Sequence, residues 1–121
     1  MRAMQRSRLF VYGTLMRGEH HHDVIEAAHF VGEARTLPAY DFVLIDYYPA
    51  LIPGGSRAIQ GELYEVDAAT LAALDALEEV PALYVRERIT LADGESAETY
   101  LLPRERAAEA RPLAVDSFRQ R

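Results

Sequence analysis

Apolar and polar residues alternate most clearly in the second half of the chain. Over residues 84–91, the side chains of Ile89 and Leu91 fall on one face, and those of Arg86 and Arg88 fall on the other. Successive side chains of a strand point to opposite faces, so this two-residue period predicts a half-buried strand.

The rest of the chain also has mainly the pattern of short strands. The turn signal Asp93-Gly94 predicts that residues 97–102 return as the hairpin partner of the strand just described. Further strands are expected over residues 8–12, 30–36, 40–46 and 58–66. Residues 47–55 are rich in proline and glycine, which favour turns, and are expected to form a loop.

Two stretches have the pattern of helices. Residues 19–30 predict a short helix, and residues 68–79 are nearly all strong helix formers. Asp67 is a good N-cap for the second helix, and Pro81 ends it. Strands dominate, with one helix inserted early and one in the middle. This order predicts an α+β fold built around a small mixed β-barrel.

The second helix carries one acid at the edge of its apolar stripe. At about 100° per residue, Leu74 lies at the centre of that stripe, Glu78 about 40° away and Glu79 about 140° away. We therefore expect Glu79 to face water and Glu78 to reach the boundary of the core. Burial there should raise the pKa of Glu78, which suits a general acid or base. The alternative is a boundary residue whose carboxylate reaches solvent.

Length and composition limit the classes of function. The chain has 121 residues, which predicts a single domain over residues 1–121, with residues 1–7 and about 104–121 as peripheral tails. Arginines near the end alternate with glutamates, and the formal net charge is −6, so a nucleic-acid partner is not expected.

Membrane and thiol chemistry are not expected either. No apolar run approaches the roughly 20 residues of a membrane helix, and the basic start lacks the core of a signal peptide. A cytoplasmic protein is therefore the default expectation. The chain has no cysteine, which excludes disulfides, thiolate metal sites and cysteine nucleophiles.

The first expected strand runs directly into the turn Tyr12-Gly13-Thr14-Leu15. Glycine can take a tight turn and lets a ligand approach the backbone closely. Consecutive N–H groups in such a turn form a concavity that can hold a carboxylate. The alternative is a turn that only changes the direction of the chain. The glycine spacing and the Lys-Ser/Thr ending of a phosphate loop are absent.

Three motifs resemble those of the γ-glutamylcyclotransferase-like proteins, and most closely those of the γ-glutamylamine cyclotransferase branch. They are Tyr12-Gly13-Thr14-Leu15-x-Arg17-Gly18, Gly61-Glu62-Leu63-Tyr64-Glu65-Val66, and the stretch from Leu74 to Arg86 that contains Glu78. The resemblance runs from about Leu9 to about Leu102, with the motifs in order.

The resemblance implies a compact β-barrel with a cavity at its mouth. In the family, the Tyr-Gly-Ser/Thr-Leu backbone grips a γ-glutamyl group, and a glutamate on the central helix acts on the α-amine. Those roles fall on Tyr12, Gly13, Thr14 and Leu15, and on Glu78. The family commonly has a small residue after this glutamate, whereas this chain has Glu79.

The implied reaction converts a γ-glutamyl amine or peptide to 5-oxoproline and a free amine, without metal or organic cofactor. Tyr84 and Tyr100 are expected to line the cavity; the alternative, strongest for Tyr100, is core aromatics whose hydroxyls reach water. Tyr47-Tyr48 is expected at its rim. The leaving amine is left open, and a monomer or weak homodimer is expected. A non-catalytic small-molecule binding module of the same fold is the competing hypothesis.

The histidines suggest a third hypothesis. On a helix over residues 19–30, His22, Glu26 and His29 would share one face, and His20-His21-His22-Asp23 resembles a metal-binding tract. A metal normally needs three or four ligands in a closed set, and no second motif of this kind is present. We therefore expect no metal site and expect His22 to pack or cap.

Overall fold

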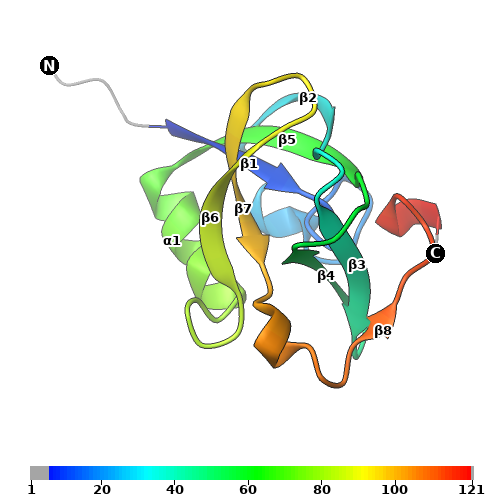
Figure 1. Cartoon of the computed structure of the whole chain (residues 1–121). Helices are drawn as coiled ribbons and strands as arrows, with labels where there is room; N and C mark the ends of the chain where they lie inside the picture. Colours follow the sequence, from blue (N-terminus) through cyan, green and yellow to red (C-terminus); the bar gives the residue numbers. More distant parts are fainter. Residues whose placement is uncertain (1–5, 121) are drawn as a thin grey trace, which may run out of the picture.

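The computed structural model describes residues 6–120. They form one eight-stranded sheet, one α-helix and short 3-10 turns (Figure 1). The strands are β1 (Arg6–Val11), β2 (His29–Arg35), β3 (Tyr40–Ile45), β4 (Tyr48–Pro53), β5 (Gln60–Asp67), β6 (Val85–Thr90), β7 (Ser96–Leu101) and β8 (Arg111–Pro112).

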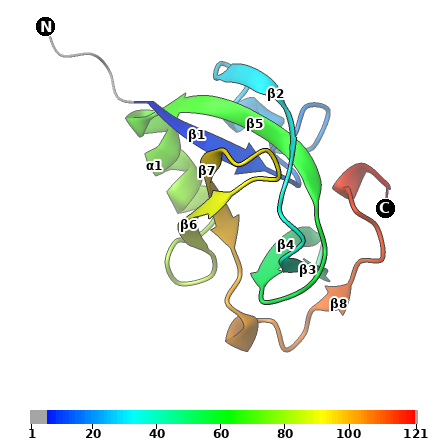
Figure 2. The same cartoon turned by 45° about the horizontal axis from the view of Figure 1, so that its top comes forward.

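The sheet is mixed. Its order is β2-β5-β1-β7-β4-β3-β8, and β6 pairs with β7 off this path. β1 is antiparallel to β5 and parallel to β7, while β4 is also parallel to β7. The sheet curls into a half-barrel, with α1 (Ala68–Leu77) along one side (Figure 2). This architecture confirms the predicted α+β class.

The core lies inside the curl of the sheet. Its largest fully buried side chains include Phe10, Phe42, Leu51, Tyr64 and Leu74, which come from four strands and α1. The hairpin predicted from the alternation of residues 84–91 is present as β6 and β7, and Gly94 takes a positive φ of 90° in its turn. None of the helices in residues 6–120 is long and apolar enough to span a bilayer.

Helix α1 begins as the sequence predicts but ends earlier. Asp67 caps it by accepting a hydrogen bond from the Thr70 N–H at 2.8 Å. The helix ends at Leu77, and Glu78 is its C-cap. Glu79 then takes a left-handed backbone with a φ of 53°, so the chain has left the helix before Pro81 is reached.

The predicted helix over residues 19–30 is wrong. The segment forms isolated turns and a three-residue 3-10 helix, His22–Val24, followed by β2. Its backbone bonds span three residues, as from Val24 N–H to the His21 carbonyl at 3.1 Å. Ile25 is its single buried hydrophobic residue, so the segment lacks the apolar stripe that stabilises a helix. Residues 6–120 therefore contain one α-helix where two helices were expected.

The loop predicted over residues 47–55 is also wrong. Residues Tyr48–Pro53 form β4, which pairs along its whole length with β3. Between the two prolines, Ala50, Leu51 and Ile52 are all buried, and this apolar run decides the structure. Asp46 and Tyr47 alone connect the two strands.

The C-terminal stretch is not a solvated tail. β8 adds to the edge of β3, and Phe118 is only 3% exposed. The N–H of Gln60 at the start of β5 donates to the Asp116 carbonyl at 2.8 Å. Of the other expected tail, residues 1–5 lie outside the described residues, while residues 6 and 7 belong to β1.

Candidate active site

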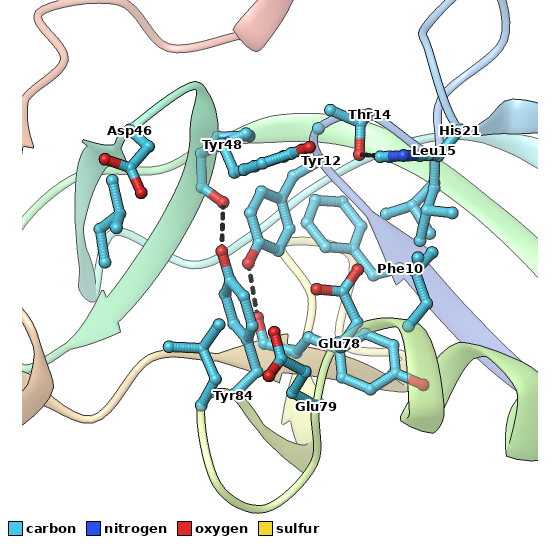
Figure 3. Close-up of a pocket in the computed structure, with 17 residues that line it drawn as sticks. Phe10, Tyr12, Thr14, Leu15, His21, Asp46, Tyr48, Glu78, Glu79 and Tyr84 are labelled. Atoms are coloured by element: carbon cyan, nitrogen blue, oxygen red, sulfur yellow. Dashed lines mark hydrogen bonds between the residues drawn. The ribbon is translucent and has the colours of Figure 1, made fainter.

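A pocket of about 330 Å³ opens where β1 ends, between the β3–β4 hairpin and the C-terminal end of α1. All seven residues singled out as catalytic or substrate-binding line it: Tyr12, Gly13, Thr14, Leu15, Glu78, Tyr84 and Tyr100. They come from three parts of the chain that the curled sheet brings together (Figure 3).

The carboxylate of Glu78 lies inside this pocket, below Phe10 (Figure 3). The backbone of Glu78 is fixed because the Glu78 N–H donates to the Leu74 carbonyl at 2.9 Å. Within residues 6–120 the carboxylate has neither a hydrogen-bond donor nor an ion-pair partner. Burial raises the pKa of Glu78 from its ordinary value of 4.5 to about 7. An acid in this environment can both accept and return a proton near neutral pH.

The neighbours of Glu78 lie partly as the helical wheel predicts. Glu79 is exposed, although its side chain stands at the edge of the same pocket (Figure 3). Leu77, which belongs to the apolar stripe centred on Leu74, is 40% exposed and lines the pocket. The helix ends at this residue, so no further turn of the chain covers its side chain.

The turn after β1 presents unused backbone donors. Gly13 accepts a hydrogen bond from the Met16 N–H at 3.1 Å, and Thr14 accepts one from the His21 N–H at 2.8 Å. The N–H groups of Gly13, Thr14 and Leu15 have no acceptor in the described part of the chain. Three consecutive open donors beside a pocket can receive an anion such as a carboxylate.

Gly13 is required for a different reason from the one expected. Its φ does not lie in the left-handed region. A Cβ atom built on Gly13 would lie 2.4 Å from Cγ of Pro49 in β4. The glycine therefore allows β4 to pack against the turn and close one wall of the pocket.

Three of the four tyrosines that line the pocket use their hydroxyls in structural hydrogen bonds. Tyr12 donates to the Tyr100 carbonyl at 2.6 Å, and Tyr84 donates to the Pro49 carbonyl at 3.1 Å. Tyr100 donates to the Asp75 carboxylate at 2.7 Å. Burial is the main cause that raises the pKa of all three phenols above its usual range. They are neutral at physiological pH and form rigid walls.

The pocket residues that the sequence did not assign include two with polar side chains, His21 and Asp46. His21 packs on Tyr48, with ring centroids 5.9 Å apart, and its Nδ1 lies 3.1 Å from the Thr14 hydroxyl. Tyr48 lines the pocket as expected, whereas Tyr47 is 86% exposed and does not. The residues around Asp46 give no sequence signal for a place in the pocket, because Asp46 reaches the pocket only through the β3–β4 hairpin.

The histidine segment does not form the ligand face that a metal would need. The helix that would align His22, Glu26 and His29 is absent, and His22 instead hydrogen-bonds the Leu15 carbonyl through Nδ1 at 2.9 Å. No group of three His, Asp or Glu side chains close enough to hold a metal occurs in residues 6–120.

Arg86 does not pair with Glu78. Its guanidinium binds Asp75 at 2.9 Å and Glu98 at 3.0 Å. A salt bridge from Arg86 or Arg88 would have withdrawn the Glu78 carboxylate from the cavity, as expected for a binding module alone. The carboxylate instead shares the cavity with the Gly13 turn.

The chain is similar to several proteins of known sequence. A putative gamma-glutamylcyclotransferase of Vibrio cholerae is 42% identical over 81 residues, covering 67% of this chain and 70% of that protein. The gamma-glutamylaminecyclotransferase of Homo sapiens is 42% identical over 87 residues. That match covers 64% of this chain and 57% of the human protein, so the chain corresponds to little more than half of the human length.

Solved structures have the same fold. The crystal structure of a uropathogenic E. coli-specific protein superposes with a TM-score of 0.83 at 31% identity, covering 97% of this chain and 95% of that one. An AIG2-like protein from Mus musculus gives a TM-score of 0.72 at 30% identity, covering 86% and 80%. The model of the family described as "Gamma-glutamyl cyclotransferase, AIG2-like" matches residues 9–120. Because this match covers nearly the whole chain and solved structures have the same fold, the chain belongs to the gamma-glutamyl cyclotransferase, AIG2-like family.

Proposed function

We propose that this protein cleaves a γ-glutamyl amine or γ-glutamyl peptide to 5-oxoproline and the free amine, with Glu78 as general acid and base. The names of the Vibrio and human relatives support this class of reaction. In the chain itself, one observation carries the proposal: the unpartnered Glu78 carboxylate shares a pocket with the open N–H groups of Gly13 to Leu15.

The two parts of the pocket suit the two ends of a γ-glutamyl group. The substrate α-carboxylate binds the N–H groups of the turn, and the α-ammonium then faces Glu78. The rings of Tyr12, Tyr84 and Tyr100 form the walls that keep the glutamyl chain folded. Holding the folded conformer is a large part of the catalysis, because the attack occurs within one molecule.

Proton transfer by Glu78 completes the reaction. The carboxylate accepts a proton from the α-ammonium, and the freed amine attacks the γ-carbonyl carbon of the same molecule. A carbon–nitrogen bond forms and closes the five-membered lactam, while the bond to the leaving nitrogen breaks. Protonated Glu78 returns its proton to that nitrogen. The ring nitrogen then gives up its second proton to Glu78, which passes it to the released amine, so that the amine leaves as an ammonium ion. No water is consumed, and the scheme uses no metal or organic cofactor.

A screen of γ-glutamyl amines and dipeptides for release of 5-oxoproline tests this proposal. The wild type is expected to turn over at least one class, and Glu78→Gln to lose about 10²–10⁴-fold in kcat, because the amide fills the same space but accepts no proton. Glu79→Gln is the matched control and should stay within about threefold of wild type. A loss of only a few-fold in Glu78→Gln would remove Glu78 from proton transfer.

The identity of the leaving amine is the next part of this proposal. The screen should vary this amine, since lysine side chains, small polyamines and protected biosynthetic intermediates all fit the reaction. A cytoplasmic location and a monomer or weak homodimer stay predictions. Gel filtration across a tenfold range of protein concentration tests the oligomeric state.

A further inference from the structure

Glu62 is a buried acid that the proposed reaction does not use. It lies on β5 and is only 1% exposed. Tyr64 donates to its Oε1 at 3.0 Å, and the guanidinium groups of Arg17 and Arg119 donate to Oε2 at 3.2 and 3.1 Å. All of these donors belong to the protein, so the Glu62 carboxylate is satisfied without a ligand. The segments around Glu62 indicate which part of the chain it holds in place.

Glu62 fixes both ends of the segment that forms the active-site turn. At the near end, Val11 is its partner in the pairing of β1 with β5. At the far end, the Arg17 N–H donates to Oε1 of Glu62 at 2.9 Å. The five residues between, 12–16, form an arch from one side of Glu62 to the other. The open N–H groups of Gly13, Thr14 and Leu15, which line the pocket, lie within this arch.

Arg119 anchors the same arch from the C-terminal end of the chain. Its Nη2 donates to the Arg17 carbonyl at 2.5 Å as well as to Glu62, and its Nη1 lies 3.4 Å from the Met16 sulfur. The buried Phe118 beside it fixes this part of the chain on the sheet. Arg119 does not line the active-site pocket, so any effect on substrate must pass through the arch.

We propose that Glu62 and Arg119 are positioning residues that hold the backbone N–H groups of Gly13 to Leu15 in the geometry that binds the substrate carboxylate. The identity of the ligand in this inference rests on the proposed function. The positioning role of Glu62 and Arg119 rests only on their hydrogen bonds to the arch. It makes the C-terminal segment 117–120 part of the machinery of a pocket that it does not touch.

The first experiment compares Arg119→Gln with Arg104→Gln. Arg104 is the matched control, because it also lies in the C-terminal stretch and pairs with an acid of the sheet, Asp41, but it is not in contact with the arch. Arg119→Gln should raise KM for the best γ-glutamyl substrate about tenfold with kcat within threefold, since the turn binds ground state and transition state alike. Arg104→Gln should leave both constants unchanged.

Amide hydrogen exchange gives a readout that does not depend on turnover. In Arg119→Gln, the amides of Met16 and Arg17, which donate to the Gly13 carbonyl and to Glu62, should exchange at least tenfold faster, while those of β3 and β4 keep their wild-type rates. In Arg119→Lys these exchange rates should lie between those of the wild type and Arg119→Gln. One ammonium group cannot reproduce the guanidinium fork that binds both Glu62 and the Arg17 carbonyl. Glu62→Gln should reproduce the loosening if it folds.

The outcomes separate the two proposals. Wild-type exchange and wild-type KM in Arg119→Gln would overturn the positioning role, whatever the enzyme does. A fall in melting temperature without a local change at Met16 and Arg17 would also overturn it. A loosened arch in a protein that turns over no γ-glutamyl compound would support the positioning role and reject the proposed function.

Discussion

Glu78 and Glu62 are both withdrawn from water, but their partners give them opposite properties. Burial also acts to raise the pKa of Glu62, but hydrogen bonds from Arg17, Tyr64 and Arg119 outweigh it and hold that pKa below its ordinary value. Glu78 has no such donors in the described residues, and its pKa rises to about 7. Glu62 is therefore a permanent anion with a structural role, whereas Glu78 can exchange a proton near neutral pH.

The pH dependence of the reaction follows from the pKa of Glu78. The free enzyme must carry Glu78 as a carboxylate to accept the first proton, so kcat/KM should rise with pH and level off above about 7. Initial rates between pH 5 and pH 9 measure this limb. Its midpoint should stay near 7 in Glu79→Gln. A limb near pH 4.5 would mean that the acting acid is solvated and is not Glu78.

The sequence predicted the direction of the Glu78 side chain better than the position of Glu78 relative to the end of the helix. The helical wheel correctly brings Glu78 to the apolar boundary, because α1 persists as far as Leu77. Glu79 is exposed, but it has a left-handed backbone outside the helix and also lines the pocket. The helical wheel could not show that Glu78 is the cap and not a residue of the last turn. Nor could it show that Leu77 would remain uncovered, since that depends on which segment packs over the end of the helix.

At the scale of elements, the pocket depends on the contact between the Gly13 turn and β4. A methyl group at Gly13 would overlap the Pro49 ring, whose Cγ lies 2.4 Å from the Cβ position. Gly13→Ala should therefore lower the free energy of unfolding by about 1–3 kcal/mol and weaken substrate binding together. Denaturant unfolding and calorimetry with a slow substrate analogue measure the two effects.

A second substitution separates this contact from backbone strain. Pro49→Ala removes the ring atoms and keeps a Cβ that lies at ordinary contact distance, 3.7 Å. In the double variant the cost of Gly13→Ala should shrink by at least half, and the two changes should be clearly non-additive. If the two free-energy costs are additive, Gly13 is required for its backbone conformation and not for the packing of β4.

The elements that local pattern predicted are those whose partners are close in sequence. The β6–β7 hairpin and the Asp67 cap need only neighbouring residues, and both are present. The errors at residues 19–30 and 47–55 have a different origin. β4 exists because β3 and β7 lie on either side of it, and a stretch with prolines at 49 and 53 gives little local sign of such pairing.

At the scale of the whole molecule, the site is assembled by long-range contacts that no local pattern encodes. The family motifs identified the turn and the acid correctly as neighbours in one pocket. They gave no sign of Arg119, because its contact with Arg17 joins residues 102 positions apart in the chain. The C-terminal stretch has the alternating charges of a solvated surface, and only the sheet beneath it shows that it is anchored.

The half-buried Glu78 and the buried Glu62 should also change the stability of the whole protein with pH. The raised pKa of Glu78 means that the native state binds more protons than the unfolded chain between about 4.5 and 7, so stability falls as pH rises through that window. The lowered pKa of Glu62 means that its contribution is lost as pH falls below its ordinary value.

Glu78→Gln isolates the first effect. At about 1.4 kcal/mol per pKa unit, removal of this carboxyl should leave stability nearly unchanged at pH 4.5. It should raise the free energy of unfolding by at most about 3 kcal/mol at pH 8. Denaturant unfolding of wild type, Glu78→Gln and Glu79→Gln at both pH values measures it. The exposed Glu79 provides the control, whose offset from wild type should not change with pH. If the Glu78→Gln and wild-type curves run parallel, the acid in the pocket titrates at an ordinary pKa, and the basis for its role in proton transfer is lost.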